Sequence, residues 1–487
     1  MCCQPFRPVL CVAAALLALA PAGGDLLAQP RRPGPPAQTA TVSAVQKADL
    51  VAALQRRIAE TYTFPDSAAA LARHLDDRLA AGAYDGLTEA VRFADRLTEH
   101  LRAFTGDLHF AVVYDPARYA RIESMGLGPN PAQYRFDGDG LEPMPVPEAG
   151  TPRYRQVVEP LRRRNFNFRK VEVLDGNVGY LRIETMPPLA LGRAKADAAM
   201  AFLADVDALV LDLRDVPGGT GGFIPYLMSY FFPPGDVLLF TREFAFADTS
   251  VAFHTYPDLP GPRLDGVPLY VLTSGMTGSA AENLAYTLQQ HGRATVVGEA
   301  TAGGAHSSSM MLLADGFVAQ IPIARVVHPV SGTNWQGVGV QPDLPAPAAA
   351  ALHTAHAAAL EHLLEATEDP PYREQLARYR TAVQADAAAS EDTRRAQQAA
   401  LAEYEGRYGT RRVFVQDGTL HYQRPGGPAV RLARIGDDLF RFDLEPGMQS
   451  PVPLPHLRFD RDASGAVVGM TALREDGAVQ DVFERAR

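Results

Sequence analysis

The sequence is poor in cysteine, with three residues in 487, and all three lie in the first eleven positions. Cys2, Cys3 and Cys11 therefore fall in a segment that we expect to be removed. A chain without them has no thiol, which excludes disulfides, cysteine nucleophiles and thiolate metal sites. We expect packing to stabilise this protein, with no metal and no cofactor.

A dense basic stretch and a long apolar run are also lacking. The net charge is -10, and no cluster of lysine and arginine could follow a phosphate backbone, so nucleic-acid binding is not supported. No later stretch approaches the ~20 consecutive apolar residues of a membrane-spanning helix. Charged residues make up 21% and hydrophobic residues 47%, which is typical of a globular protein.

The N-terminus has the order of residues that directs export. Arg7 precedes an apolar run from Val9 to Ala20, and the small residues Ala20-Pro21-Ala22 follow. We expect residues 1–28 to be a signal peptide, residues 29–41 to be a Pro-rich linker, and the protein to be periplasmic or extracellular.

Periodicity divides the rest of the chain. Apolar residues at three- and four-residue spacing predict three helices in an N-terminal helical domain, 42–106. A connecting segment (107–170) leads to an α/β core (171–345), a helical connector (346–405) and a small β domain (406–487). Within the core we predict strands at 178–183, 208–213, 269–273 and 295–297, and helices at 189–202, 223–230 and 279–290.

Ser279 lies where a predicted buried strand turns into a helix. Unpaired N–H groups and the positive end of the helix dipole favour negative charge at this place, which suits an acyl-transfer nucleophile. The alternative is that Ser279 only caps the helix.

A second candidate element is the segment LVLDLRDVPGGTGG (209–222), an apolar strand followed by a glycine-rich loop. Glycines let backbone N–H groups approach a ligand closely, as an oxyanion hole requires. The alternatives are a flexible turn or an anion-binding loop. A phosphate loop is disfavoured because no Gly-Lys-Ser/Thr follows.

Together these segments resemble the serine peptidase family that includes C-terminal processing peptidases, tricorn protease and the interphotoreceptor retinoid-binding protein repeats. The motifs that carry the resemblance are TGSAAE (277–282), LDLRDVPGG (211–219), GEATAGGAH (298–306) and GVGVQPD (337–343). The resemblance implies a crotonase-like spiral of βα units and peptide-bond hydrolysis through an acyl-enzyme. It also implies an oxyanion hole from the amides of Gly218 or Gly219 and Ala280.

The resemblance also bears on the general base. Processing peptidases carry a lysine about 25 residues after the serine, where this chain has Gly304, and none of its three lysines follows Ser279. The tricorn and retinoid-binding branch has a histidine in a short segment after the helical region. TGDLHF (105–110) resembles this segment. His109 is therefore the candidate base, and His306 is the rival.

Two positions depart from the tricorn-type site. Leu108 precedes His109 where that site has a serine, and Gln336 stands where it has a glutamate that orients the imidazole. Asp107 could replace the missing charge or only cap a turn. Trp335, the only tryptophan, is more typical of packing than of substrate recognition.

The leading hypothesis is an exported serine peptidase that acts on a peptide or protein through Ser279 and His109. No segment resembles an inserted PDZ module. The alternative is a non-catalytic protein that uses a peptidase-like core to bind an apolar ligand or peptide. An α/β-hydrolase is disfavoured because Ser279 lacks the Gly-x-Ser-x-Gly elbow.

Overall fold

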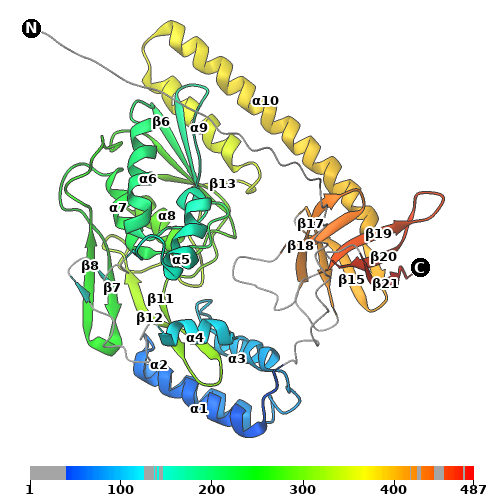
Figure 1. The fold of residues 1–487 in the computed structure, drawn as a ribbon. Helices are drawn as coiled ribbons and strands as arrows, with labels where there is room; N and C mark the ends of the chain where they lie inside the picture. The colour runs from blue at the N-terminus through cyan, green and yellow to red at the C-terminus, as the bar shows by residue number, and fades with distance from the viewer. Residues whose placement is uncertain are drawn as a thin grey trace, which may run out of the picture.

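The computed structural model describes residues 40–124, 136–137, 140–141, 146–416, 418–424, 429–443, 455–474 and 478–486. The predicted signal peptide and all but the last two residues of the predicted linker lie outside these ranges. The described chain has a mixed α/β fold with several sheets (Figure 1). Among the described residues, no helix is both long and apolar enough to cross a membrane.

The three predicted N-terminal helices are confirmed. They are α1 (Ala44–Thr61), α2 (Pro65–Ala80) and α3 (Ala90–Thr105). Helix α1 begins at a capping box in which the Ser43 hydroxyl and the Gln46 side chain satisfy each other's backbone N–H groups. Helix α3 ends at Gly106, whose left-handed conformation (φ 66°) turns the chain sharply toward the candidate base.

These helices share their core with an antiparallel sheet that the sequence analysis did not predict. Leu54 of α1 and Leu97 of α3 belong to one apolar cluster with Phe317 and Ile321. The strand order is β1-β12-β7-β8, and β11 also pairs with β12. The strands are β1 (Ala111–Tyr114), β7 (Leu238–Phe244), β8 (Thr249–His254), β11 (Ser307–Leu312) and β12 (Phe317–Val327).

The central sheet has the order β13-β10-β9-β6-β5-β4 and is parallel except for the β4–β5 pair. Its strands are β4 (Phe168–Leu174), β5 (Val178–Ile183), β6 (Ala208–Asp212), β9 (Leu269–Thr273), β10 (Thr295–Gly298) and β13 (Leu344–Pro345). The four predicted core strands are thereby confirmed. Parallel strands need helical crossovers, so helices cover the sheet.

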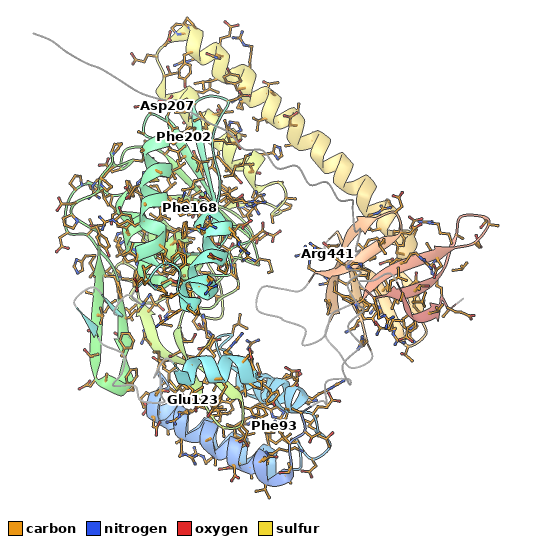
Figure 2. All side chains as sticks on the ribbon, viewed as in Figure 1. Phe93, Glu123, Phe168, Phe202, Asp207 and Arg441 are labelled. Atoms are coloured by element: carbon orange, nitrogen blue, oxygen red, sulfur yellow. The ribbon has the colours of Figure 1, made fainter. Side chains whose placement is uncertain are left out.

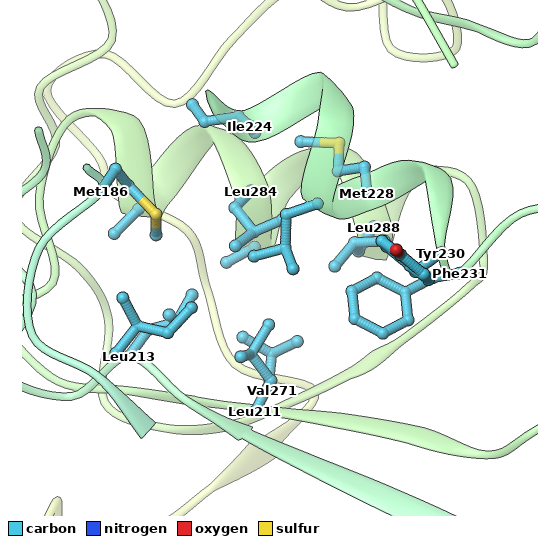
Figure 3. Close-up of a cluster of buried hydrophobic side chains, with 14 of the residues drawn as sticks. Met186, Leu211, Leu213, Ile224, Met228, Tyr230, Phe231, Val271, Leu284 and Leu288 are labelled. Carbon is cyan, nitrogen blue, oxygen red and sulfur yellow. The ribbon is translucent and has the colours of Figure 1, made fainter. Parts of the chain in front are cut away.

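Alternate side chains of the central strands enter two different cores. Leu211 and Val271 belong to one apolar cluster with residues of α6 (Leu189–Phe202), α7 (Ile224–Ser229) and α8 (Ala280–Gln290). Figure 3 shows them facing side chains of α7 and α8. Val210 and Leu272 face the other way, against α9 (Ala351–Ala366) and the first part of α10 (Pro370–Leu401). This arrangement fixes β9, whose end leads into the turn with Ser279, between two packed layers.

The predicted connecting segment (107–170) contains helices α4 (Pro116–Ser124) and α5 (Pro152–Arg163) and the short strands β2 (Phe136–Asp137) and β3 (Gly140–Leu141). At the other end of the chain, α10 leads to an antiparallel sheet with its own apolar cluster (Figures 1 and 2). Its strands are β14 (Gly406–Tyr408), β15 (Arg411–Gln416), β16 (Thr419–Gln423), β17 (Ala429–Gly436), β18 (Leu439–Asp443), β19 (His456–Arg461), β20 (Val467–Leu473) and β21 (Val479–Glu484).

Candidate active site

The fold brings His109 and Ser279 together although 170 positions separate them in the chain. The Nε2 atom of His109 lies 3.1 Å from Oγ of Ser279, within hydrogen-bonding distance. The backbone N–H of His109 donates to Oδ1 of Asp107 at 2.9 Å. This hydrogen bond holds the backbone of His109, and so the base of its side chain, in the turn after α3. An imidazole in this position can accept the hydroxyl proton when the oxygen attacks a carbonyl.

Ser279 has an unusual backbone conformation. Its φ of 50° and ψ of -113° are rare for a residue with a side chain, and such strain costs about 1–3 kcal/mol. The turn holds this conformation because the Ser279 N–H donates to Oε2 of Glu282 at 2.6 Å. The serine therefore stands at the start of α8 in a conformation that the surrounding contacts impose.

Glu282 is fully buried and joins the serine turn to the glycine-rich loop. Besides the serine amide, its carboxylate accepts the amide N–H groups of Gly303 at 2.6 Å and Gly304 at 3.0 Å, and the Thr301 hydroxyl at 2.5 Å. Burial raises the pKa of Glu282, and these hydrogen bonds oppose the rise. Glu282 is the last residue of the TGSAAE motif, and the motif alone did not predict this role for it.

Asp107 lies between two histidines. Its Oδ2 atom is 2.6 Å from Nδ1 of His306, and its Oδ1 atom is 3.5 Å from Nδ1 of His109, which has no closer polar partner among the described residues. Burial alone would raise the pKa of Asp107, but hydrogen bonds from His109 and His306 outweigh it and hold the pKa well below its usual range. The carboxylate is therefore ionised beside the candidate base, and it also caps the turn.

The structure places the rival base, His306, away from the serine hydroxyl. Its ring is buried, donates toward Asp107 and packs against Phe64, with ring centroids 5.1 Å apart. His306 thus supports the carboxylate that faces His109. The break between α1 and α2 supplies Phe64, and it also supplies Tyr62, whose pKa is raised by burial and by the charge of Asp107. These contacts were not foreseen from the sequence.

Among the described hydrogen bonds, none joins Gln336 to His109. Its Oε1 atom accepts the Ala305 N–H at 2.8 Å, and its Nε2 atom donates to the Gly106 carbonyl at 3.3 Å. Gln336 therefore ties the turn that carries the base to the glycine-rich loop. Leu108 is 47% exposed. Trp335 is buried, in agreement with the predicted packing role, and its Nε1 donates to the Gly304 carbonyl at 3.1 Å.

The glycine-rich loop passes directly over the histidine ring. A Cβ atom on Gly304 would lie 2.8 Å from Cε1 of His109, closer than real Cβ contacts, and 3.4 Å from Nδ1 of the same ring. The imidazole thus occupies the space that a side chain at position 304 would need. This explains why the chain can have His109 or a side chain at 304, but not both, in this arrangement.

The three predicted oxyanion donors lie beside the serine turn. A Cβ on Gly218 would lie 2.9 Å from Cβ of Ser279 and 3.4 Å from the Ala280 nitrogen. Gly219 has a φ of 128° and packs on the backbone of Met186, so neither glycine leaves room for a side chain. Within the described chain, the amides of Gly218, Gly219 and Ala280 donate no hydrogen bond to a protein carbonyl.

The strand motif before this loop holds it in place. Arg214 binds Asp212 through two hydrogen bonds, Nε to Oδ1 at 2.9 Å and Nη2 to Oδ2 at 2.7 Å. The Gly278 N–H donates to the Val216 carbonyl at 2.9 Å, and the Met186 N–H donates to the Gly218 carbonyl at 2.9 Å. These contacts fix the loop against the serine turn. The serine hydroxyl, the histidine ring, the aspartate carboxylate and the free backbone amides are thus arranged as acyl transfer requires.

No group of three or more histidine, cysteine, aspartate or glutamate residues that could hold a metal ion occurs in the part of the chain that the structure describes.

Comparison with known proteins gives two family matches. Residues 177–346 match peptidase family S41, and residues 40–131 match the N-terminal domain of Peptidase S41 in eukaryotic IRBP.

Curated relatives match the core. A carboxy-terminal-processing protease of Bartonella bacilliformis is 29% identical over 175 residues, which are 35% of this chain and 39% of that protein. Carboxyl-terminal-processing peptidase 1, chloroplastic, of Arabidopsis thaliana is 31% identical over 182 residues, 37% of this chain and 35% of that protein. The chain thus spans little more than a third of the length of these relatives.

Among solved structures, the photosystem II D1 C-terminal processing protease matches with a TM-score of 0.40 and 16% identity, covering 63% of this chain and 94% of that one. The tricorn protease matches with a TM-score of 0.36 and 14% identity, covering 62% of this chain and 34% of that one.

Proposed function

The chain belongs to peptidase family S41, and from this premise we propose that it is an exported serine peptidase with a crotonase-like core. It hydrolyses peptide bonds through an acyl-enzyme on Ser279, with His109 as general base. The observation that carries this proposal is the hydrogen-bonding distance of 3.1 Å between Nε2 of His109 and Oγ of Ser279. The residue order of positions 1–28 supports export.

In the proposed reaction, Oγ of Ser279 attacks the carbonyl carbon of the scissile peptide bond while Nε2 of His109 takes its proton. The amides of Gly218 or Gly219 and Ala280 stabilise the negative oxygen, each donor contributing about 3 kcal/mol to the transition state. His109 then returns the proton to the leaving amine. The ionised Asp107 stabilises the positive imidazole throughout, which is the role that a glutamate has in tricorn-type sites.

Two features support Asp107 in this role over Gln336. Asp107 faces Nδ1 of His109, whereas the described contacts of Gln336 are with Gly106 and Ala305. A neutral residue at 336 is therefore compatible with a working base.

The proposal is tested by following hydrolysis of an unfolded protein substrate such as reduced casein. We expect Ser279→Ala and His109→Ala each to lower the rate by at least about 1,000-fold, because the two residues act as one unit. His254→Ala is the control, since His254 lies on β8 and pairs with Asp236 outside the site.

Two results would contradict the proposal. Loss of activity in His306→Ala with activity retained in His109→Ala would make His306 the base. A folded chain that never hydrolyses substrate but binds a peptide or apolar ligand saturably would support the non-catalytic alternative.

A further inference from the structure

Arg242 lies in the middle of β7 and is surrounded by apolar groups. Only 7% of the residue is exposed. Its Cζ atom stacks 4.7 Å from the ring centroid of Phe253 and 5.6 Å from that of Phe240. Its neighbours across the sheet are Val251 on β8 and Val326 on β12. No strand beside it supplies a carboxylate at this register.

The guanidinium has no counter-charge. No hydrogen bond or ion pair joins it to any residue in the described ranges, and its Nε atom is enclosed without a partner. Burial lowers the pKa of Arg242 to about 10, so the group remains charged at neutral pH. Burying an unpaired charge destabilises a fold strongly, and titratable groups whose pKa burial shifts strongly are concentrated at functional sites.

Two other cations with little exposure in the described chain have polar partners. Lys47 donates from Nζ to the Tyr84 carbonyl at 2.7 Å, and Arg214 binds the carboxylate of Asp212. Arg242 differs from both, because its guanidinium has no hydrogen bond or ion pair among the described residues.

The guanidinium points at the loop that carries the oxyanion donors. A Cβ on Gly221 would overlap Nη2 of Arg242 and lie 3.3 Å from its Cζ. Gly221 is three residues after Gly218, where an added Cβ would lie 2.9 Å from Cβ of Ser279, and three residues span at most about 11 Å. A Cβ on the neighbouring Gly222 would meet nothing within 4 Å. The charge is therefore within reach of a peptide bound at Ser279.

We propose that Arg242 is a carboxylate-binding subsite that selects substrates with an anionic group within about three residues of the scissile bond. This inference rests on the proposed function. A guanidinium binds a carboxylate through two parallel hydrogen bonds, and stacking on Phe240 and Phe253 holds its plane in advance. The carboxylate belongs either to an aspartate or glutamate side chain or to the C-terminus of the substrate.

The test compares the full chain with its Arg242→Met and Arg242→Lys variants on a mixed peptide library made by digesting a proteome. Cleavage sites are identified by mass spectrometry, and half of the library has its carboxyl groups amidated. Arg325→Met is the matched control, because Arg325 is directly next to Val326, the partner of Arg242 on β12, is 40% exposed and pairs with Glu243 at 4.0 Å.

We expect the unaltered chain and Arg325→Met to cleave carboxylate-containing peptides about 10- to 100-fold faster than their amidated forms. A side-chain source gives enrichment of Asp or Glu at one fixed position, and a terminal source gives cleavage at a fixed distance from the C-terminus. Arg242→Met should lose the preference, and Arg242→Lys should keep part of it because it retains charge without the planar fork.

Stability provides a second readout. Methionine removes an unpaired buried charge and keeps the length of the side chain, so Arg242→Met should have a melting temperature equal to or above that of the unaltered chain. A preference that survives in Arg242→Met, or the absence of any preference for carboxylates in the unaltered chain, overturns the inference and leaves the proposed peptidase activity standing.

If neither the unaltered chain nor any variant cleaves the library, the proposed peptidase activity is contradicted, and the carboxylate subsite is tested by binding. The library is then equilibrated with immobilised full-length Ser279→Ala and with Ser279→Ala/Arg242→Met, and the retained peptides are counted. Retention of carboxylate peptides on the first protein alone supports a carboxylate subsite, and equal retention on both contradicts it.

Discussion

At the scale of single residues, the site depends on one carboxylate with two partners. Asp107 directs one oxygen to the ring of His109 and the other to His306, so that both imidazoles are held by the same group. His306 has its own support from Phe64. Replacing Asp107 would therefore change the charge beside the base and the packing behind it at once.

We predict that Asp107→Asn lowers kcat/KM by about 100- to 10,000-fold while KM changes little, because the imidazolium loses its compensating charge. Asp115→Asn is the control, since Asp115 accepts the Arg118 N–H at the start of α4 and lies outside the site. Steady-state kinetics on a cleaved peptide measures both. An Asp107→Asn variant with unaltered kcat/KM would remove the carboxylate from the mechanism.

The same variant should change how stability depends on pH. The pKa of Asp107 is held below its unfolded value of about 3.9, so the ionised carboxylate stabilises the fold above about pH 4. This stabilisation is lost as the pH falls from there toward the folded-state pKa. The stability difference between the unaltered chain and Asp107→Asn, measured by urea unfolding, should be constant from pH 7 to 5 and should shrink below about pH 4.

The candidate pair itself could be predicted from sequence because each member stands in a motif, DLH for His109 and TGSAAE for Ser279. The partnership of Asp107 with His306 could not, since 199 positions separate them and no short motif contains both. The unpaired state of Arg242 was equally hidden, because it depends on what three strands place around the side chain.

At the scale of elements, the glycine-rich loop between β10 and β11 contacts the other parts of the site. Glu282 holds it from the start of α8, and Gln336 holds it from the segment after β12. Gly304 in this loop packs on the ring of His109. The position of the loop therefore determines the position of the base.

We predict that Gly304→Ala lowers kcat/KM by about 100-fold, because the added methyl group would lie 2.8 Å from Cε1 of His109 and would displace the ring. Gly275→Ala is the matched control, as a Cβ there meets nothing within 4 Å. Hydrolysis rates and unfolding curves should be measured together. If Gly304→Ala is as active as Gly275→Ala, the ring is not where the loop requires it.

Elements of the central sheet could be predicted well because the apolar runs in their sequences match the buried positions that these strands have in the structure. The strand at 178–183 and the helix at 189–202 have the predicted bounds. The second sheet was missed for physical reasons. Strand β11 begins with three serines, which have low β-propensity, and β12 contains Pro322, which argues against a strand inside a sheet. Tertiary pairing determines both.

At the scale of the whole molecule, the first part of the helical connector packs on the central sheet, whereas its end leads to the C-terminal sheet. Helix α9 and the start of α10 cover one face of the central sheet, through Leu360 and Leu376 among others. The C-terminal sheet has a separate apolar cluster that includes Tyr404 and Phe459. The candidate active site should therefore need these helices but not the terminal sheet.

We predict that a chain ending at Leu401 folds and hydrolyses peptides within about threefold of the full chain, whereas a chain ending at Pro345 unfolds or aggregates. The shorter chain would expose the apolar face formed by Val210 and Leu272, and each such side chain contributes about 1.5–3 kcal/mol when buried. Circular dichroism and hydrolysis assays distinguish the two. Loss of activity in the chain ending at Leu401 would give the terminal sheet a part in catalysis.

The central claim is that Ser279 is a nucleophile activated by His109, and a fluorophosphonate probe tests it most directly because the probe forms a covalent bond with an activated serine. The folded chain is incubated with the probe, and the modified residue is located by peptide mass spectrometry. We predict a single adduct on Ser279, which is absent from Ser279→Ala and at least about 100-fold slower to form in His109→Ala. A folded chain that stays unlabelled, or one labelled at another serine, would contradict the account.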